Sequence, residues 1–291
     1  MSHQLLQLLF SGLTLGSIYS LMALALVATF NITGVLNLAQ GEFAAIGALL
    51  AITLTAAGMP FPASFLAAIL LVGALGGVLE RTAIHNARRA SGLTLILITI
   101  GLSISLRGLA LLIWGTDTYS LPAFSQGGPL FLGEAAVNLQ SLWILGLVLV
   151  SLTLLYLFLN STYTGKAVKA SVINRTAARL VGINPGTISF WAFVGSGVLG
   201  AAAGIFIAPI TMITYDMGFT LGIKGFVAAA IGGLNNVAGA VLGGLLLGVL
   251  EAYSAGLVSS GLKDAFAIII LLVILLVRPE GILGVLGERK I

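Results

Sequence analysis

Four long stretches of this chain contain no Asp, Glu, Lys or Arg, and they constrain its fold more than any other feature. They run over residues 1–41, 43–79, 135–165 and 180–215. A bilayer core about 30 Å thick is crossed by roughly 20 apolar residues in a helix, so each stretch can hold at least one span. Charged residues make up 8% of the chain, whereas an ordinary soluble domain has about 25%. The sequence therefore predicts a protein whose solvent is lipid.

The apolar stretches are predicted to be helices. Only helices and closed barrels satisfy the backbone inside a bilayer, and barrel strands alternate in polarity. Residues 145–159 and 267–277 are apolar on every face. We therefore predict an all-α fold, a polytopic transmembrane helical bundle forming a single membrane domain over residues 1–291. Eight or nine membrane segments are expected, at about Leu5–Phe30, Gly34–Ala57, Phe61–Leu79, Leu93–Trp114, Leu139–Leu159, Ile188–Ile210, Gly225–Leu234, Val237–Leu257 and Asp264–Val277. The short seventh segment is a candidate re-entrant or broken helix.

Basic residues are concentrated in a few loops, which indicates topology rather than nucleic-acid binding. Lys and Arg in short loops mark the cytoplasmic side of a membrane protein. Basic residues occur in the loop 81–92, in the longer loop 160–187, and in the C-terminal tail at Arg278, Arg289 and Lys290. The loop 115–138 has Asp117 and Glu134 and no basic residue. We expect a cytoplasmic C-terminus, and an external N-terminus if the first three spans are all complete.

The loop 160–187 contains an amphipathic segment, Lys166–Asn184. Apolar residues recur there at helical spacing, with most basic residues off the apolar stripe. Gly182 fits a helix C-cap, and Asn184 followed by Pro185 ends the helix. One interpretation is a helix lying on the membrane surface, and the other is a helix that docks in a groove of a cytoplasmic partner. The stripe consists of Ala170, Ile173, Ala177, Leu180 and Val181, and the basic residues are Lys166, Lys169, Arg175 and Arg179.

Two polar interruptions within apolar segments are candidate pathway or broken-helix sites. The first contains Asn37, Gln40 and Glu42, and an ionisable group at bilayer depth is usually functional or paired. Its alternative is an interfacial glutamate that reaches water. The second contains Gly232, Gly233, Asn235 and Asn236. Such interruptions occur in broken helices near transport pathways, although tight helix packing alone also explains glycines spaced by four.

The motifs of a catalytic or nucleotide-binding chain are missing. No G-x-x-x-x-G-K-[ST] run is present, since Gly165-Lys166 is followed by Ala167 and lacks the upstream glycine. The chain has no cysteine and two histidines, His3 and His85, which cannot build a histidine metal cluster. We therefore predict no catalytic residues, no metal site and no cofactor bound by this chain. A permease driven by a separate ATPase and an ion-coupled secondary transporter or channel both remain open on this pattern.

Four motifs together resemble the branched-chain amino acid ABC transporter permease family, LivH type. The run from Asn174 to Asn184, NRTAARLVGIN, resembles the family's cytoplasmic loop motif, and Arg278-Pro279-Glu280-Gly281 resembles its C-terminal motif. Asn37-Leu38-Ala39-Gln40-Gly41-Glu42 resembles N-[FLM]-A-H-G-[ED], with glutamine where histidine is common. A proton-linked role of that histidine therefore does not carry over. The glycine-rich run 224–244 matches the family pattern at Phe226, Ala228, Gly232, Gly233, Gly239, Ala240, Gly243 and Gly244.

The resemblance favours the permease over the secondary transporter and implies its partners. These would be a second related permease, two cytoplasmic ABC ATPase subunits that use ATP and Mg²⁺, and an extracytoplasmic solute-binding protein, in a bacterial inner membrane. The cargo would be branched-chain amino acids or related small amino acids and amides. The residues implied to couple the chain to the ATPases are Lys166, Lys169, Asn174, Arg175, Ala177, Ala178, Arg179, Leu180 and Gly182.

Overall fold

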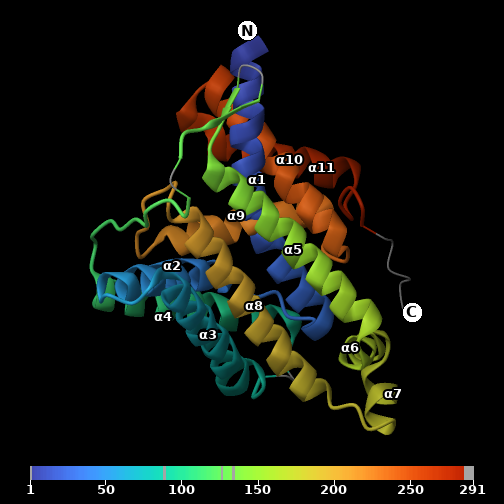
Figure 1. The fold of residues 1–291 in the computed structure, drawn as a ribbon. Helices are drawn as coiled ribbons and strands as arrows, with labels where there is room; N and C mark the ends of the chain where they lie inside the picture. The colour runs from blue at the N-terminus through green and yellow to red at the C-terminus, as the bar shows by residue number, and fades with distance from the viewer. Residues whose placement is uncertain (1, 88–89, 126, 133–134, 285–291) are drawn as a thin grey trace.

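The computed structural model describes residues 2–87, 90–125, 127–132 and 135–284, and within them the chain is a bundle of apolar helices (Figure 1). The prediction of a polytopic helical membrane protein is confirmed. Seven helices are long and apolar enough to cross a membrane, and two shorter apolar helices, α2 and α9, accompany them. The main elements are α1 (Ser2–Thr33), α2 (Gln40–Ala56), α3 (Phe61–Leu79), α4 (Gly92–Trp114), α5 (Leu139–Ser161), α6 (Tyr163–Ile173), α7 (Arg175–Leu180), α8 (Pro185–Ile207), α9 (Met217–Gly232), α10 (Val237–Leu257) and α11 (Lys263–Val277). Short elements are a π-helical turn η1 (Glu80–Ile84), a 3-10 turn η2 (Ser260–Leu262) and a hairpin of β1 (Leu130–Leu132) and β2 (Ala135–Val137).

Two predicted segments begin elsewhere than expected. The second helix begins at Gln40 rather than Gly34, because Gly34 has a left-handed backbone (φ 72°) that ends α1 and the next residues are not helical. The segment predicted at Gly225–Leu234 is in fact α9, a helix of 16 residues that begins at Met217. The predicted segment began directly after the charged residue Lys224. Lys224 instead lies within α9, where its ammonium is paired with Glu251 inside the bundle.

Helix α1 lies at the centre of the bundle and packs most extensively against α10 (Figure 1). Glycines on both helices make the contact close. A Cβ built on Gly16 would lie 2.8 Å from the Cα of Leu245, and one on Gly248 would overlap the backbone of Gly16. The Ser20 hydroxyl donates to the carbonyl of Val241 at 2.7 Å, so it also bonds across this interface. The glycine spacing seen in the sequence is therefore used for helix association.

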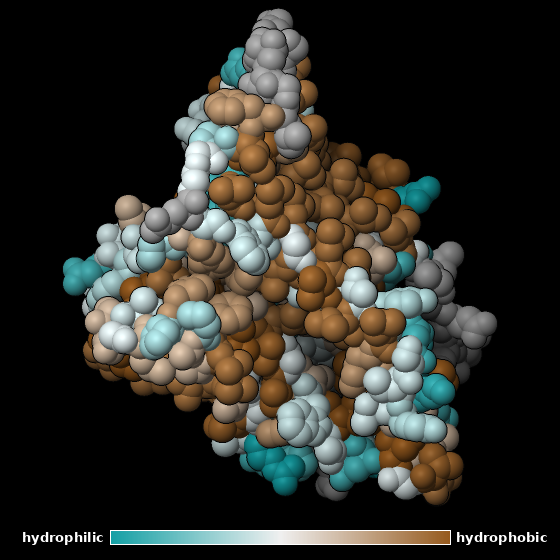
Figure 2. All heavy atoms as spheres, in the orientation of Figure 1, coloured by the Kyte–Doolittle hydropathy of each residue, from teal (hydrophilic) through white to brown (hydrophobic). Residues whose placement is uncertain are grey.

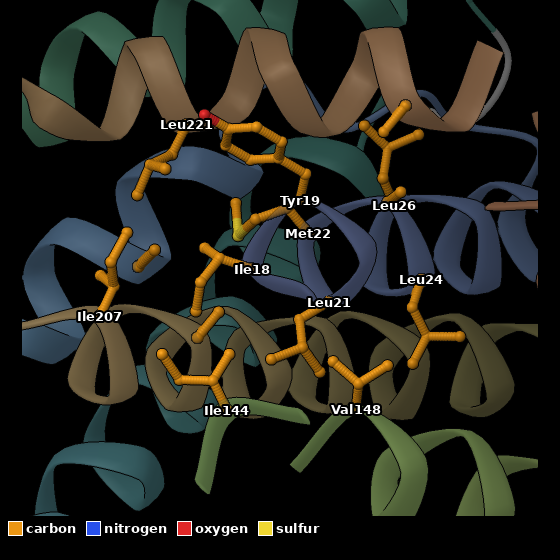
Figure 3. Close-up of a cluster of buried hydrophobic side chains, with 14 of the residues drawn as sticks. Ile18, Tyr19, Leu21, Met22, Leu24, Leu26, Ile144, Val148, Ile207 and Leu221 are labelled. Carbon is orange, nitrogen blue, oxygen red and sulfur yellow. The ribbon is translucent and has the colours of Figure 1, made fainter. Parts of the chain in front are cut away.

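The buried face of α1 is surrounded by aliphatic side chains from several helices (Figure 3). Ile18, Leu21 and Met22 of α1 are fully buried. They belong to one cluster with Ile144 of α5 and Leu221 of α9. Close packing of this kind supplies the dispersion contacts that hold helices together where lipid is as apolar as the core.

The outer helices carry apolar side chains on their exposed faces. Leu112 of α4, Leu154 of α5 and Leu276 of α11 are all more than half exposed. On the face drawn in Figure 2, hydrophobic residues cover the middle of the molecule, and hydrophilic residues gather at its lower end and margins. Such a surface is suited to lipid and not to water.

The N-terminal end of α1 and the β1–β2 hairpin share one end of the bundle. The Gln7 side chain donates to the carbonyl of Ala136 and accepts from its N–H, both at 3.0 Å. Helices α6 and α7 lie at the opposite end (Figure 1). Five charges used in the topology prediction lie outside the described part of the chain: Arg88, Arg89, Glu134, Arg289 and Lys290.

Candidate functional sites

The loop predicted to hold one amphipathic helix holds two short helices instead. Helix α6 ends at Ile173, and α7 begins at Arg175. Between them Asn174 has an extended backbone (φ −151°, ψ 103°), and its side-chain oxygen accepts from the N–H groups of Thr176 and Ala177 at 3.0 Å. This N-cap starts a new helix, so the prediction of a single helix is wrong.

The apolar stripe of this segment is largely exposed. Ile173 is 72% exposed and Leu180 is 85% exposed, whereas Ala178 is buried against the rest of the protein. Gly182 has φ 83°, and the following N–H, of Ile183, donates to the carbonyl of Ala178 at 2.9 Å, which confirms the predicted C-cap. Ala177 is also exposed. The segment thus presents apolar side chains that no other described part of the chain covers.

Basic side chains lie around this apolar surface. The ammonium of Lys166 lies 5.7 Å from the ring centre of Tyr163, and that of Lys169 donates to Asn160 at 2.5 Å. Arg179 is exposed. The side chain of Arg175 lies outside the described part of the structure. We call residues 163–182 the α6–α7 segment.

An apolar groove of about 730 Å³ lies between α5 and α8, next to the α6–α7 segment. Its walls also include parts of α1 and α6. Phe158 of α5 and Trp191 of α8 line it. The groove is therefore bounded by the helices on both sides of the α6–α7 segment, since α5 leads into α6 and the segment returns into α8.

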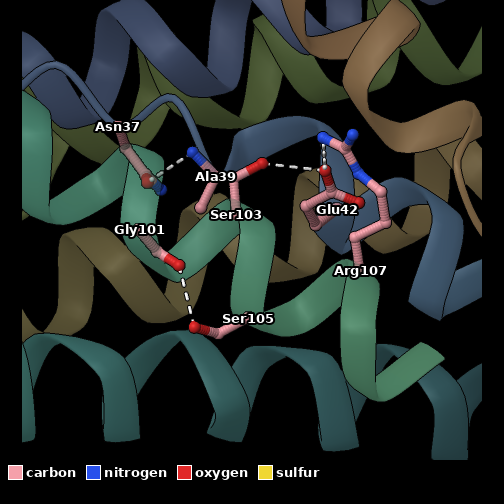
Figure 4. Close-up of polar contacts among 7 residues, drawn as sticks. All are labelled: Asn37, Ala39, Glu42, Gly101, Ser103, Ser105 and Arg107. Carbon is pink, nitrogen blue, oxygen red and sulfur yellow. Dashed lines mark hydrogen bonds and ion pairs between the residues drawn. The ribbon is translucent and has the colours of Figure 1, made fainter. Parts of the chain in front are cut away.

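The first polar interruption lies at the break between α1 and α2 (Figure 4). Asn37 is buried, and its side-chain oxygen accepts from the Ala39 N–H at 3.2 Å. Gln40 donates to the carbonyl of Ser196 on α8 at 3.0 Å and accepts from the Ser196 hydroxyl. These bonds pair the Gln40 amide and the Ala39 N–H where the chain leaves helical geometry, whereas Asn37 Nδ2 is buried without a hydrogen-bond partner among the described residues.

Glu42 is paired with α4. One carboxylate oxygen, Oε1, accepts from the Ser103 hydroxyl at 2.8 Å and from Arg107 Nη2 at 3.1 Å (Figure 4). The Glu42 side chain is 1% exposed, so it does not reach water from an interface. Close packing keeps it there, because a Cβ on Gly218 of α9 would lie 2.5 Å from its second oxygen, Oε2.

The second polar interruption lies between α9 and α10, and its residues form hydrogen bonds with Leu283 in the C-terminal segment. Gly233 has φ 110°, and Asn236 caps α10 by accepting from the Gly239 N–H at 3.0 Å. The Asn236 amide also donates to the carbonyl of Leu283 at 3.0 Å. The N–H of Leu283 in turn donates to the carbonyl of Gly232 at 3.1 Å. Asn235 is exposed.

The predicted site residues therefore occupy three separate places. The coupling candidates lie in the α6–α7 segment, Asn37, Gln40 and Glu42 lie at the α1–α2 break, and the glycines and asparagines lie at the α9–α10 break. The structure does not gather them into one pocket.

Sequence reasoning missed a buried charge cluster. Lys224 of α9 lies 2.5 Å from Glu251 of α10 and 2.8 Å from Asp264 of α11, and its ammonium is 5.4 Å from the ring centre of Tyr19. Lys224 and Glu251 are buried inside the bundle. Their presence in apolar segments was the available signal, and their pairing depends on contacts between different helices.

Comparison of the sequence with known proteins identifies the family of this chain. Residues 8–277 match the family described as branched-chain amino acid transport system / permease component. The high-affinity branched-chain amino acid transport system permease protein BraD of Pseudomonas aeruginosa is 35% identical, over 97% of this chain and 96% of that protein. The corresponding LivH protein of Escherichia coli is 32% identical, over 96% of this chain and 95% of its own length. The fructose import permease protein FruG of Bifidobacterium longum is 25% identical over 93% of this chain. The chain therefore belongs to the family of branched-chain amino acid transport system permease components.

Proposed function

We propose that this chain is the membrane-spanning permease subunit of an ABC importer that carries branched-chain amino acids across a bacterial inner membrane. The family membership and the names of the relatives support this function. The chain itself performs no covalent chemistry in this proposal. It alternates between conformations whose relative stability depends on the solute and on its partners.

The α6–α7 segment is the structural feature that supports this proposal best. It combines exposed apolar residues, Ile173 and Leu180, with the exposed basic residue Arg179. Helix-in-groove recognition uses an apolar face in this way, with charged residues around it. The segment is the docking site for a cytoplasmic ATPase subunit, which hydrolyses ATP with Mg²⁺ and moves α6 against α8.

The complete importer contains a second related permease and two ATPase subunits. An external solute-binding protein delivers the amino acid to the outward-open state. In this arrangement the loop 160–187 and the C-terminus face the cytoplasm, and the end that carries Gln7 and the β1–β2 hairpin faces outward.

The test is leucine uptake by the complete importer with charge-reversed α6–α7 segments. Arg179→Glu, alone and together with Arg175→Glu, is expected to reduce ATP-dependent uptake at least tenfold while membrane abundance stays normal. Arg81→Glu reverses an exposed charge elsewhere on the chain and serves as the control. Unchanged uptake by the double variant would exclude this docking site.

Copurification tests the assembly independently. The chain, expressed with its neighbouring genes and extracted gently, is expected to bring down P-loop ATPases and a second permease, identified by mass spectrometry. If the chain is recovered alone and an ion gradient drives its leucine uptake without ATP, it is a secondary transporter.

A further inference from the structure

Arg107 has an unusual place for a charged residue, because its guanidinium lies near the middle of a membrane-length helix. Ser103 is the central residue of α4, about 16 Å from either end at 1.5 Å per residue. Arg107 lies one turn nearer the C-terminal end of α4. Its Nη2 nevertheless bonds the same Glu42 oxygen as the Ser103 hydroxyl. The side chain therefore reaches back towards the centre of α4, as helical side chains do, and not to the nearer membrane surface.

The guanidinium is only partly covered by this chain. The Arg107 side chain is 26% exposed, whereas that of its partner Glu42 is 1% exposed. Arg107 Nε is buried and has no hydrogen-bond acceptor among the described residues. A partly exposed charged group at bilayer depth is expensive against hydrocarbon, and such groups face a bundle interior or a water-filled cavity. The surface of α4 around Arg107 therefore does not face lipid.

Apolar side chains of α9 lie next to this guanidinium. The Phe219 ring centre is 4.6 Å from Arg107 Cζ. Phe219 is 51% exposed and Ile223, one turn further along α9, is 43% exposed. A fixed guanidinium beside an exposed apolar face matches a small solute that has a carboxylate at one end and a hydrocarbon side chain at the other. The groove between α5 and α8 does not, because its lining is almost entirely apolar.

We propose, on the basis of the function proposed above, that Arg107, Phe219 and Ile223 line the solute pathway and that the Arg107 guanidinium binds the carboxylate of the passing amino acid. We call these three residues the Arg107 surface. Glu42 and Ser103 are positioning residues, since they hold the guanidinium at mid-depth. The second permease completes the pathway across from this surface.

Cysteine labelling tests the pathway directly, because the natural chain contains no cysteine. Phe219→Cys and Ile223→Cys, in the complete importer in proteoliposomes, are treated with a negatively charged methanethiosulfonate reagent. Leu109→Cys is the control, on an α4 residue that is 54% exposed, close to Arg107 in depth but about 200° away around the helix. We expect the two α9 cysteines to react, and saturating leucine with its binding protein to slow the reaction at least threefold. The control cysteine should stay unmodified.

Failure to label either α9 cysteine would show that lipid or a partner subunit covers the Arg107 surface, and would overturn the proposal. If the cysteines react at the same rate with and without leucine, the proposal is also overturned, because water reaches the surface but the solute does not occupy it.

The carboxylate contact is tested by counting leucine molecules imported per ATP hydrolysed. Arg107→Gln is expected to lower this ratio at least tenfold, and Arg107→Lys less, because lysine keeps the charge but not the forked donors. A merely structural arginine would lower uptake and ATP hydrolysis together and leave the ratio unchanged. If Arg107→Gln alone does not assemble, Glu42→Gln with Arg107→Gln removes the unpaired buried charge, and the labelling result decides in any case.

The two proposals fail in different ways. If wild-type uptake needs neither ATP nor the partner proteins, the importer assignment is wrong. If wild-type uptake needs both, but Arg107→Gln leaves the ratio unchanged and leucine does not slow the labelling, the importer assignment stands and the Arg107 surface is not part of the solute pathway.

Discussion

Lys224 of α9 donates a hydrogen bond to Glu251 of α10, and the Nζ–Oε1 distance is 2.5 Å. Both side chains are at most 10% exposed. Asp264 at the start of α11 binds the same ammonium at 2.8 Å. One lysine therefore connects three helices that are consecutive in the chain.

Removing Lys224 is expected to destabilise the protein strongly. Lys224→Met leaves Glu251 as an uncompensated buried charge, which costs about 3–5 kcal/mol. The measurement is the temperature at which the detergent-solubilised protein loses its monodisperse peak in size-exclusion chromatography.

Lys224→Met combined with Glu251→Gln is the matched control. The double variant removes both buried charges and should recover most of the lost stability. If the double variant is as unstable as Lys224→Met, the pair does not stabilise the bundle electrostatically.

Gly248→Ala should separate α10 from α1. The added Cβ would overlap the backbone of Gly16, which cannot move without shifting the central helix. Overpacking of this kind costs about 1–3 kcal/mol. We expect a lower unfolding temperature and a lower yield of folded protein in the membrane.

Gly146→Ala on α5 isolates the packing effect, because a Cβ there meets no atom within 4 Å. That change should be neutral or stabilising by about 0.5–1 kcal/mol, since alanine is the better helix former. Equal behaviour of the two alanine variants would contradict the close α1–α10 contact.

Gly233→Ala should release the C-terminal segment from the α9–α10 break. Its φ of 110° is unfavourable for alanine, and the new Cβ would lie 2.7 Å from the Gly284 nitrogen. Faster cleavage after Glu280 by the glutamate-specific protease Glu-C, followed by mass spectrometry, measures the release.

Gly58→Ala is the control for backbone strain. Gly58 has a similar φ of 90°, but a Cβ there meets nothing within 4 Å. It should lose stability through its backbone alone and leave the Glu-C cleavage rate after Glu280 unchanged. Cleavage that increases equally in both variants would show that the tail responds to general instability.

Asn174→Ala should weaken coupling without unfolding the bundle. It removes the acceptor for the Thr176 and Ala177 N–H groups, which costs α7 about 1 kcal/mol. Because α7 lies at one end of the molecule, we expect normal abundance but several-fold lower leucine uptake per ATP hydrolysed.

Asn174→Asp keeps an N-cap acceptor and serves as the control. It should retain near-normal coupling, because aspartate caps about as well as asparagine. A loss of coupling equal to that of Asn174→Ala would mean that the side-chain amide, and not the cap, is required.

The membrane fold could be predicted because it follows from local composition. The gaps between charged residues located the apolar segments, and two of the predicted helices, Phe61–Leu79 and Val237–Leu257, have the predicted bounds. The α9–α10 break was predicted from Gly232-Gly233 and Asn235-Asn236, whereas the second helix was expected to begin at Gly34 and begins at Gln40.

The pairing of charges could not be predicted from local pattern. Glu42 and Arg107, and likewise Lys224 and Glu251, belong to different helices, and only the packing of those helices brings them together. The break at Asn174 was in principle predictable, because asparagine favours N-caps. The apolar periodicity continues across it, from Ile173 to Ala177, and this continuity concealed the break.

The break at Asn174 gives the α6–α7 segment the mechanics of a jointed lever. A continuous helix is stiff in bending and in torsion, because each turn is hydrogen-bonded to the next. When two helices are joined through one extended residue, a displacement of one along the chain moves the other, but a rotation of one about its axis is hardly passed on. If an ATPase subunit binds α7, the orientation of α7 can therefore vary while α6 still moves along its own axis.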